Sequence, residues 1–299
     1  DLRWLVDYIQ TNDPDGEGYY QAYTHIAPDE TIMEETDEEH FYQIGGATIF
    51  DNNGVKELQM LWGEIDNHEG KMTRTGTCLA VYSLEGQPGN STYLKRISKN
   101  EEFNTDDVGY GSTIWKDEDG HIYLYVTENN RPLVARTTTH DLTSEWEYYI
   151  RDLSGNFMWQ KMYPTKEERT RSTIMENNYV CSMPQIFKKG DYYYMIGQAV
   201  SYGHSVYLYR GETPYGPFTD QKILFNVPYS VDKICHQYYK NLLRVNLHLE
   251  LAREGELVFS TNTDADTAGD NFDFPCSADF CRPYFYRIFN WESIYDEDD

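Results

Sequence analysis

Four short stretches rich in aromatic and β-branched residues recur along the chain at nearly constant spacing. They begin at Leu58, Ile122, Tyr192 and Glu256, which are 64, 70 and 64 residues apart, and all but one directly follow a glycine-containing turn. Such runs, bounded by Gly, Pro and Asp, are typical of short antiparallel strands joined by tight turns. A repeat of this length with several strands per unit predicts a β-propeller.

Each of these four stretches is followed by a second predicted strand, at 77–82, 132–136, 205–209 and 283–288. Helical signals are poor, and 161–176 is the one segment that reads as a helix or long insertion, so we reject a βαβ architecture. We predict an all-β, five-bladed β-propeller in a single domain, 1–299. Its blades are an incomplete first one at 1–45 and then 46–100, 108–160, 180–226 and 236–290.

The chain is strongly acidic, with 25 Lys and Arg against 50 Asp and Glu and a formal net charge of −25. This balance argues against nucleic acid or an anionic membrane as a partner, because both require a basic face. No apolar run approaches the roughly 20 residues needed to cross a membrane. The plain interpretation of the charge is solubility, and we expect the acidic runs at 34–39 and 296–299 to be solvated.

Neither the cysteines nor the first residues of the chain indicate in which cellular compartment the protein is found. The five cysteines form no metal-type Cys-x-x-Cys pair, although Cys276 and Cys281 are close enough to bridge a loop. Asn90 begins an N-glycosylation sequon, which matters only in a eukaryotic secreted protein. The chain opens at Asp1 in a predicted strand, so we expect a mature product or a fragment.

The order of several segments between Gly109 and Ile288 resembles successive blades of five-bladed propeller glycosidases. These segments read IYLYVTENNRPLVAR, SMPQIFKKGDYYYMIGQ, LYRGETPYGPF and NLHLELAREGELVFS. The chain is most similar to secreted propeller families of unknown function related to arabinanases. The resemblance implies a carbohydrate partner, an extracellular or periplasmic location, and a funnel where two carboxylates flank the glycosidic bond.

The first catalytic acid of these relatives has no obvious counterpart. Where relatives carry an Asp after a glycine on entering the second blade, this chain has Gly46. Either the first inner strand precedes residue 1 or catalytic acids have been lost. The remaining candidates are Glu64 and Asp66, which follow the predicted strand ending at Gly63, and Glu128 in the equivalent position of the next unit.

The segment Leu247–Leu251 is the best positional match to a His-Pro-Glu-Leu run of the relatives. On a strand, His248 and Glu250 lie two residues apart and share a face, so both are predicted to point inward. Glu250 is then a candidate catalytic acid, and His248 holds a sugar hydroxyl, a water or an ion, or is a hydrogen-bonded core histidine. No cofactor is implied beyond a possible central calcium ion.

Three further residues are candidates for substrate binding. Gln185 and His204 lie at predicted strand or loop ends of the fourth blade, and Arg282 closes the last blade. The alternative for each is propeller packing. We find no Ser-His-Asp order, P-loop or Rossmann glycine pattern.

Two functions of different classes follow. The first is a glycoside hydrolase-like propeller that cleaves a polysaccharide, arabinan or similar, with two carboxylates. The second is a catalytically inactive propeller that serves as a glycan-binding or structural subunit of a secreted assembly. Fold likeness does not separate them, because function depends on the site.

Overall fold

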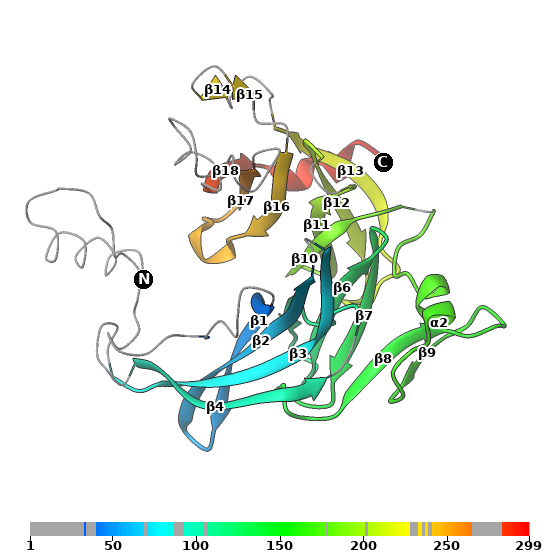
Figure 1. The fold of residues 1–299 in the computed structure, drawn as a ribbon. Helices are drawn as coiled ribbons and strands as arrows, with labels where there is room; N and C mark the ends of the chain where they lie inside the picture. Colours follow the sequence, from blue (N-terminus) through cyan, green and yellow to red (C-terminus); the bar gives the residue numbers. More distant parts are fainter. Residues whose placement is uncertain are drawn as a thin grey trace, which may run out of the picture. The chain divides into compact units, whose positions relative to one another are not determined.

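A computed structural model shows that the described part of the chain is built almost entirely of antiparallel β-sheets (Figure 1). It divides into two compact units, Asp1–Gly109 and Tyr110–Asp299, which we describe separately. The structure describes residue 33 and residues 40–68, 71–86, 93–104, 107–177, 179–200, 203–227, 233–234, 237–238, 241–264 and 283–298.

The first unit contains one four-stranded antiparallel sheet with strands in chain order. Asn53 and Gly54, both with positive φ (54° and 90°), make the tight turn between its first two strands, as expected for an Asn-Gly hairpin. A β-bulge between Ile44 and Ala47 interrupts the first strand, so Gly46 lies in the bulge. The strands are β1 (His40–Asn52), β2 (Val55–His68), β3 (Lys71–Leu84) and β4 (Tyr93–Asn104).

Both faces of this sheet bury apolar side chains at its centre. Trp62 lies opposite Cys78 on one face, and Leu61 lies opposite Leu79 on the other, and all four are buried. The alternation follows from the two-residue period of a strand. The central strands β2 and β3 are therefore fixed in register by packing on both sides.

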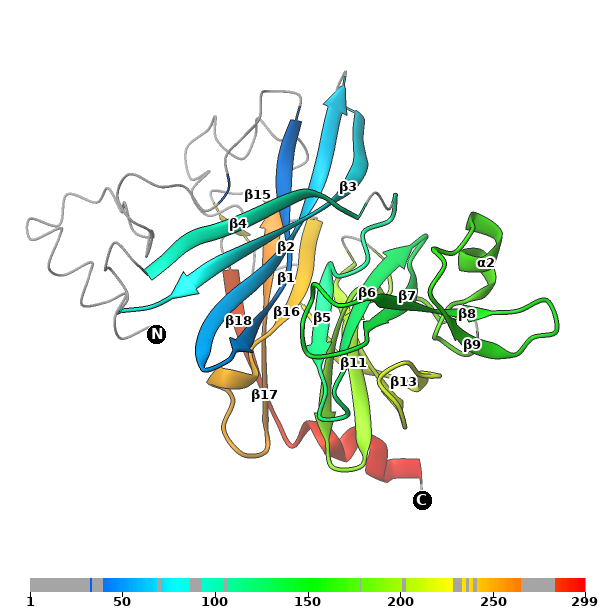
Figure 2. The ribbon, with the colours of Figure 1, turned by 90° about the horizontal axis from the view of Figure 1, so that it is seen from below.

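The second unit contains three larger sheets and a two-stranded ribbon, which Figure 2 shows from a second direction. A five-stranded sheet consists of β5 (Thr113–Lys116), β6 (Ile122–Glu128), β7 (Arg131–Thr137), β8 (Trp146–Arg151) and β9 (Phe157–Gln160). A four-stranded sheet consists of β10 (Ser182–Lys189), β11 (Tyr192–Gln198), β12 (Ser205–Gly211) and β13 (Thr219–Asn226).

The remaining sheets of this unit lie toward the C-terminus. A three-stranded sheet consists of β16 (Asn241–Leu247), β17 (Glu256–Asp264) and β18 (Pro283–Phe289), and the ribbon consists of β14 (Lys233–Ile234) and β15 (Gln237–Tyr238). The helical segments that the structure describes are short: α2 (Lys166–Arg171) and the 3-10 helices η1 (Leu249–Leu251) and η4 (Trp291–Asp298). In the described residues no helix is long and apolar enough to cross a membrane.

Two apolar clusters hold the three large sheets of the second unit together. Tyr125 and Val134 pack with Met195 and Tyr209 between the five-stranded and four-stranded sheets. Phe187 and Ile196 of the four-stranded sheet belong to the second cluster, with Leu242 and Phe259 of the three-stranded sheet. Trp115 of β5 packs against both clusters.

The fold class is confirmed as all-β with sheets arranged as a β-propeller. In the described part of the chain four sheets form blades, where five were predicted. The predicted first blade, 1–45, falls almost entirely outside the described residues, and β1 pairs with β2 instead of closing a separate sheet. Cys276, Cys281 and the Asn90 sequon also lie outside them.

Candidate functional site

Glu64 lies near the end of β2, on the same sheet face as Trp62. Its neighbours across the strands are Tyr42 on β1 and Gly76 on β3. A Cβ atom at position 76 would lie 2.9 Å from Glu64 Oε2. Glycine at this position therefore leaves room for the Glu64 carboxyl group above β3.

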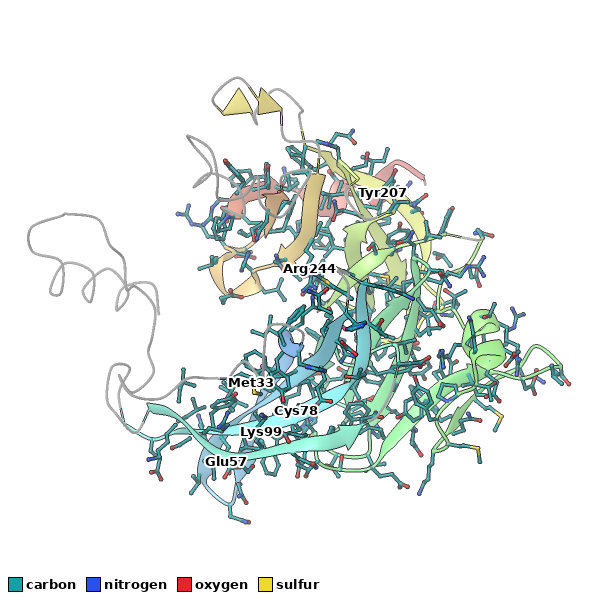
Figure 3. All side chains as sticks on the ribbon, in the orientation of Figure 1. Met33, Glu57, Cys78, Lys99, Tyr207 and Arg244 are labelled. Carbon is teal, nitrogen blue, oxygen red and sulfur yellow. The ribbon has the colours of Figure 1, made fainter. Side chains whose placement is uncertain are left out.

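A second carboxylate, Glu101 of β4, is close enough to interact electrostatically with Glu64. Lys99 Nζ lies 2.7 Å from Glu101 Oε1 and 4.7 Å from the centre of the Tyr42 ring. The Tyr42 hydroxyl donates to Glu101 Oε1 at 3.4 Å. Figure 3 labels Lys99 and Cys78 on this sheet. Glu64, Tyr42, Lys99 and Glu101 are called the Glu64 cluster below.

The environment of the Glu64 carboxyl favours its protonated form. Burial is the main reason that the pKa of Glu64 is raised, and the charge of Glu101 adds to it, whereas Lys99 and Arg74 oppose it. Burial also raises the pKa of the nearby Cys78 thiol to about 11. A carboxyl group with a raised pKa beside an ion-paired carboxylate has the properties expected of a general acid next to a base or nucleophile.

Arg74 is held on the opposite face of this sheet. Its Nη2 donates to Thr77 Oγ1 at 2.7 Å. Its guanidinium lies so close to Gly63 and Gly109 that a Cβ atom at either position would overlap it. A side chain at either position would therefore displace the Arg74 guanidinium from this place.

Glu128 occupies the end of β6, as predicted, but its carboxylate is engaged by Arg169 of helix α2. Arg169 Nε donates to Oε2 at 3.1 Å and Nη2 donates to Oε1 at 3.2 Å. Arg169 is buried, and its Nη1 also donates to the Pro164 carbonyl. Glu128 thus anchors the loop that carries α2.

His248 and Glu250 do not lie on a strand, which corrects the expected extended segment. Strand β16 ends at Leu247, and Leu249–Leu251 form the 3-10 helix η1. Their side chains nevertheless meet, with His248 Nδ1 3.4 Å from Glu250 Oε1. His248 Nε2 lies 2.9 Å from Ser260 Oγ on β17.

The other predicted site residues have simpler surroundings. Asp66 lies two positions beyond Glu64, opposite His40 and Thr73. Gln185 Nε2 donates to Thr113 Oγ1 at 3.3 Å, and His204 Nδ1 lies 3.2 Å from the Val227 carbonyl oxygen. Arg282 lies outside the described residues.

The sequence interpretation missed three members of the Glu64 cluster: Tyr42, Lys99 and Glu101. Tyr42 and Glu101 are 59 residues apart in the chain, so no local motif signals their contact. Among the side chains that the structure describes, no group of three or more His, Cys, Asp or Glu could hold a metal ion. The central calcium ion stays a prediction.

The fold and this site define a β-propeller protein that carries a pair of interacting carboxylates on one sheet. The chain belongs to the family described as a domain of unknown function (DUF5005), which matches residues 3–291. No curated protein matches it.

A solved structure with substantial sequence identity is that of a candidate hydrolase from Bacteroides ovatus ATCC 8483. It is 52% identical, with a TM-score of 0.84, and the match covers 98% of this chain and 73% of that chain.

More distant similarity is found with two enzymes. An exo-beta-1,3-galactanase from Phanerochaete chrysosporium is 10% identical over 82% of this chain and 46% of that chain, with a TM-score of 0.44. A xylan beta-1,4-xylosidase from Bacillus halodurans C-125 is 12% identical over 81% of this chain and 41% of that chain, with a TM-score of 0.43.

Proposed function

We propose that this chain is a glycoside hydrolase-like propeller that acts on a polysaccharide, arabinan or similar, through two carboxylates. The observation that carries the proposal is the Glu64 carboxyl group, whose pKa is raised by burial and by the charge of the Glu101 carboxylate. A relative with 52% identity is named as a candidate hydrolase, which supports the reaction class. The proposed location is extracellular or periplasmic.

In this mechanism Glu64 donates its proton to the glycosidic oxygen as the bond to the anomeric carbon breaks. Glu101 either takes a proton from the attacking water, or attacks the anomeric carbon to form a glycosyl ester that a water molecule, deprotonated by Glu64, then hydrolyses. Lys99 holds Glu101 through the 2.7 Å ion pair, and Tyr42 adds a hydroxyl that can bind a sugar oxygen. All four residues of the Glu64 cluster belong to the same sheet, so the register of its strands brings them together.

Two observations favour the second function, an inactive glycan-binding or structural propeller. Gly46 lies in the β1 bulge, at the position where the resemblance to propeller glycosidases implies an acid, and Glu128 is paired with Arg169. An inactive propeller would keep the sheets while lacking two carboxylates able to catalyse cleavage.

The experiment is a sugar-release assay on arabinans, xylans and fructans with the full chain. Glu64→Gln and Glu101→Gln are compared with wild type and with the control Glu57→Gln, which lies on β2 far from Glu64 and keeps the oxygen that accepts from Asn52. Glu250→Gln tests the sequence-based candidate in parallel. We expect release to fall at least about 100-fold in the first two variants only.

Release that is unchanged in both Glu64→Gln and Glu101→Gln would contradict the assignment of these residues. Release from no glycan by folded wild type would favour the inactive propeller. Binding of the same polysaccharides, measured by affinity electrophoresis, would then separate a glycan-binding subunit from a purely structural one.

A further inference from the structure

Ser260, His248 and Glu250 form a second polar cluster, located in the three-stranded sheet of the second unit. His248 Nε2 lies 2.9 Å from Ser260 Oγ. On the other side of the ring, His248 Nδ1 lies 3.4 Å from Glu250 Oε1. The imidazole therefore contacts a hydroxyl through one nitrogen and a carboxylate through the other.

The backbone explains how two residues close in sequence reach the same ring. Strand β16 ends at Leu247, and the His248 amide donates to the Val258 carbonyl at 2.9 Å, which ties the chain to β17 as it leaves the sheet. The single turn of η1 then brings Glu250 back beneath His248. Ser260 follows two residues after Val258 on the same strand.

Ser260 is itself buried, at 2% exposed, and lies on the sheet face that carries Phe285 at the β18 edge. Its partners across the strands are Asn246 on β16 and Phe285 on β18. Residues of β18 alternate between exposed and partly buried, and Phe285, 55% exposed, is on the exposed side. The Phe285 ring lies 5.0 Å from the His248 ring and forms an apolar wall at the edge of the cluster.

Acyl transfer also requires a donor to the oxyanion, and Asn246 is the candidate for it. It lies directly opposite Ser260, and among the described residues its side-chain amide has no hydrogen-bond partner. Side chains of directly opposed residues are within about 5.5 Å at Cβ. An asparagine amide at this distance from a nucleophile is a suitable donor to a developing oxyanion.

We propose that Ser260, His248 and Glu250 act as nucleophile, base and orienting acid of an ester hydrolase site for small acyl esters, such as those on sugar hydroxyls. The arrangement matches the requirement that a nucleophile contacts a base and that a third group orients the base. It uses no residue of the Glu64 cluster and does not depend on the function proposed above.

The reaction balances with water as the only co-substrate. Ser260 Oγ bonds to the acyl carbon while its proton passes to His248 Nε2, and the bond from the acyl carbon to the alcohol oxygen then breaks. His248 returns the proton to that oxygen, which releases the alcohol. A water molecule attacks the acyl-serine by the same route and releases the carboxylic acid and free Ser260.

The experiment measures covalent labelling of the full chain by a fluorophosphonate, followed by peptide mapping, and hydrolysis of p-nitrophenyl acetate. Ser260→Ala and His248→Gln are compared with wild type and with Ser293→Ala, a serine whose hydroxyl donates to the Asn290 carbonyl. We expect label on Ser260, and a loss of labelling and hydrolysis of at least about 100-fold in the first two variants.

Glu250→Gln keeps the test decisive if Ser260→Ala fails to fold. The Glu250 side chain is 70% exposed, so its replacement leaves the core intact, and we expect labelling to slow at least about 10-fold. Absence of label on Ser260 in folded wild type, or hydrolysis that persists in folded Ser260→Ala or His248→Gln, would overturn the proposal. None of these readouts requires a glycan, so failure here leaves the glycosidase proposal unaffected.

Discussion

Arg169 donates two hydrogen bonds to the Glu128 carboxylate, from Nε to Oε2 at 3.1 Å and from Nη2 to Oε1 at 3.2 Å. The two residues are 41 positions apart and join helix α2 to the end of β6. Arg169 is only 5% exposed, so its charge depends on this partner. Planar, bidentate pairing of this kind is the strong form of an ion pair.

Arg169→Ala is therefore expected to lower the free energy of unfolding by about 3 kcal/mol, because it leaves the Glu128 charge without its partner and opens a gap beside Tyr163. Urea unfolding followed by fluorescence measures the change. Lys166→Ala, at an exposed position of the same helix, is the control and should cost less than about 0.5 kcal/mol. Equal effects of the two changes would contradict the role of the pair.

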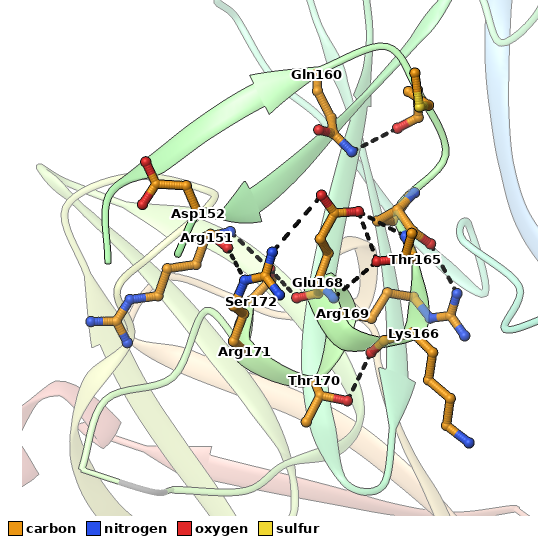
Figure 4. Close-up of polar contacts among 12 residues, drawn as sticks. Arg151, Asp152, Gln160, Thr165, Lys166, Glu168, Arg169, Thr170, Arg171 and Ser172 are labelled. Carbon is orange, nitrogen blue, oxygen red and sulfur yellow. Dashed lines mark hydrogen bonds and ion pairs between the residues drawn. The ribbon is translucent and has the colours of Figure 1, made fainter. Parts of the chain in front are cut away.

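The start of α2 gives a second prediction, through the capping box seen in Figure 4. The Glu168 amide donates to Thr165 Oγ1 at 3.3 Å, and the Thr165 amide donates to Glu168 Oε2 at 2.8 Å. Thr165→Ala should cost about 1 kcal/mol of stability. Thr165→Ser, which keeps the hydroxyl, should restore most of it. A serine variant as unstable as the alanine variant would rule out the cap as the cause.

The same capping box predicts that the stability contributed by Glu168 depends on pH. The hydrogen bond from the Thr165 amide, together with the charge of Arg171, lowers the pKa of Glu168. A lowered carboxyl pKa contributes stability above the unfolded value, about 4.3, and the contribution is lost as pH falls through the folded value. Glu168→Gln should therefore be destabilising at pH 7, and the difference from wild type should shrink by pH 3. A difference that is equal at both pH values would contradict this account.

The strand cores could be predicted because their signals are local. Stretches that begin at Leu58, Ile122, Tyr192 and Glu256 lie in β2, β6, β11 and β17. In each stretch, aromatic and β-branched residues alternate or cluster beside a turn. Such a pattern indicates a strand wherever the strand lies in the fold. Strand β4, by contrast, is rich in charged residues and carries no such pattern; its place follows from pairing with β3.

The sites depend on register and on chain reversals, which local patterns do not encode. Glu64 was a candidate because it follows a strand core, but its partner Glu101 comes from β4, two strands away in the sheet. His248 and Glu250 were expected on one strand face, and a 3-10 turn brings them together instead. Ser260 joins them only because β17 pairs with β16.

Gly197 of β11 leads to a fourth prediction, because a Cβ atom there would lie 2.5 Å from Cys181 Sγ and 3.1 Å from the Ser182 carbonyl oxygen. Cys181 is fully buried and cannot move aside. Gly197→Ala should therefore cost about 1–3 kcal/mol. In the double variant with Cys181→Ala the cost should be clearly less than the sum of the two single changes.

Gly120→Ala is the matched control for this comparison of single and double variants. Gly120 has a φ of 97° and no atom near its missing Cβ, so its replacement strains the backbone without a steric clash. Its cost should be the same with or without Cys181→Ala. Coupling of similar size at both glycines would show that the effect is not steric.

The raised pKa of Glu64 leads to a fifth prediction, on the pH dependence of stability. Burial and the Glu101 charge raise this pKa, so the folded state binds the proton more tightly than the unfolded state does. Such a group contributes stability below the unfolded pKa, about 4.3, and the contribution is lost as pH rises through the folded value.

Glu64→Gln should therefore become progressively more favourable, relative to wild type, as pH rises from 4 to 7. Urea unfolding at pH 4, 5.5 and 7 measures the difference, with Glu57→Gln as the control on the same strand. Glu101→Gln removes one of the two causes, so in its background the pH dependence of the Glu64→Gln difference should be weaker. A difference that stays constant across this range, or that grows in favour of wild type, would show that Glu64 ionises as an ordinary surface carboxylate and would remove the basis for its role as a general acid.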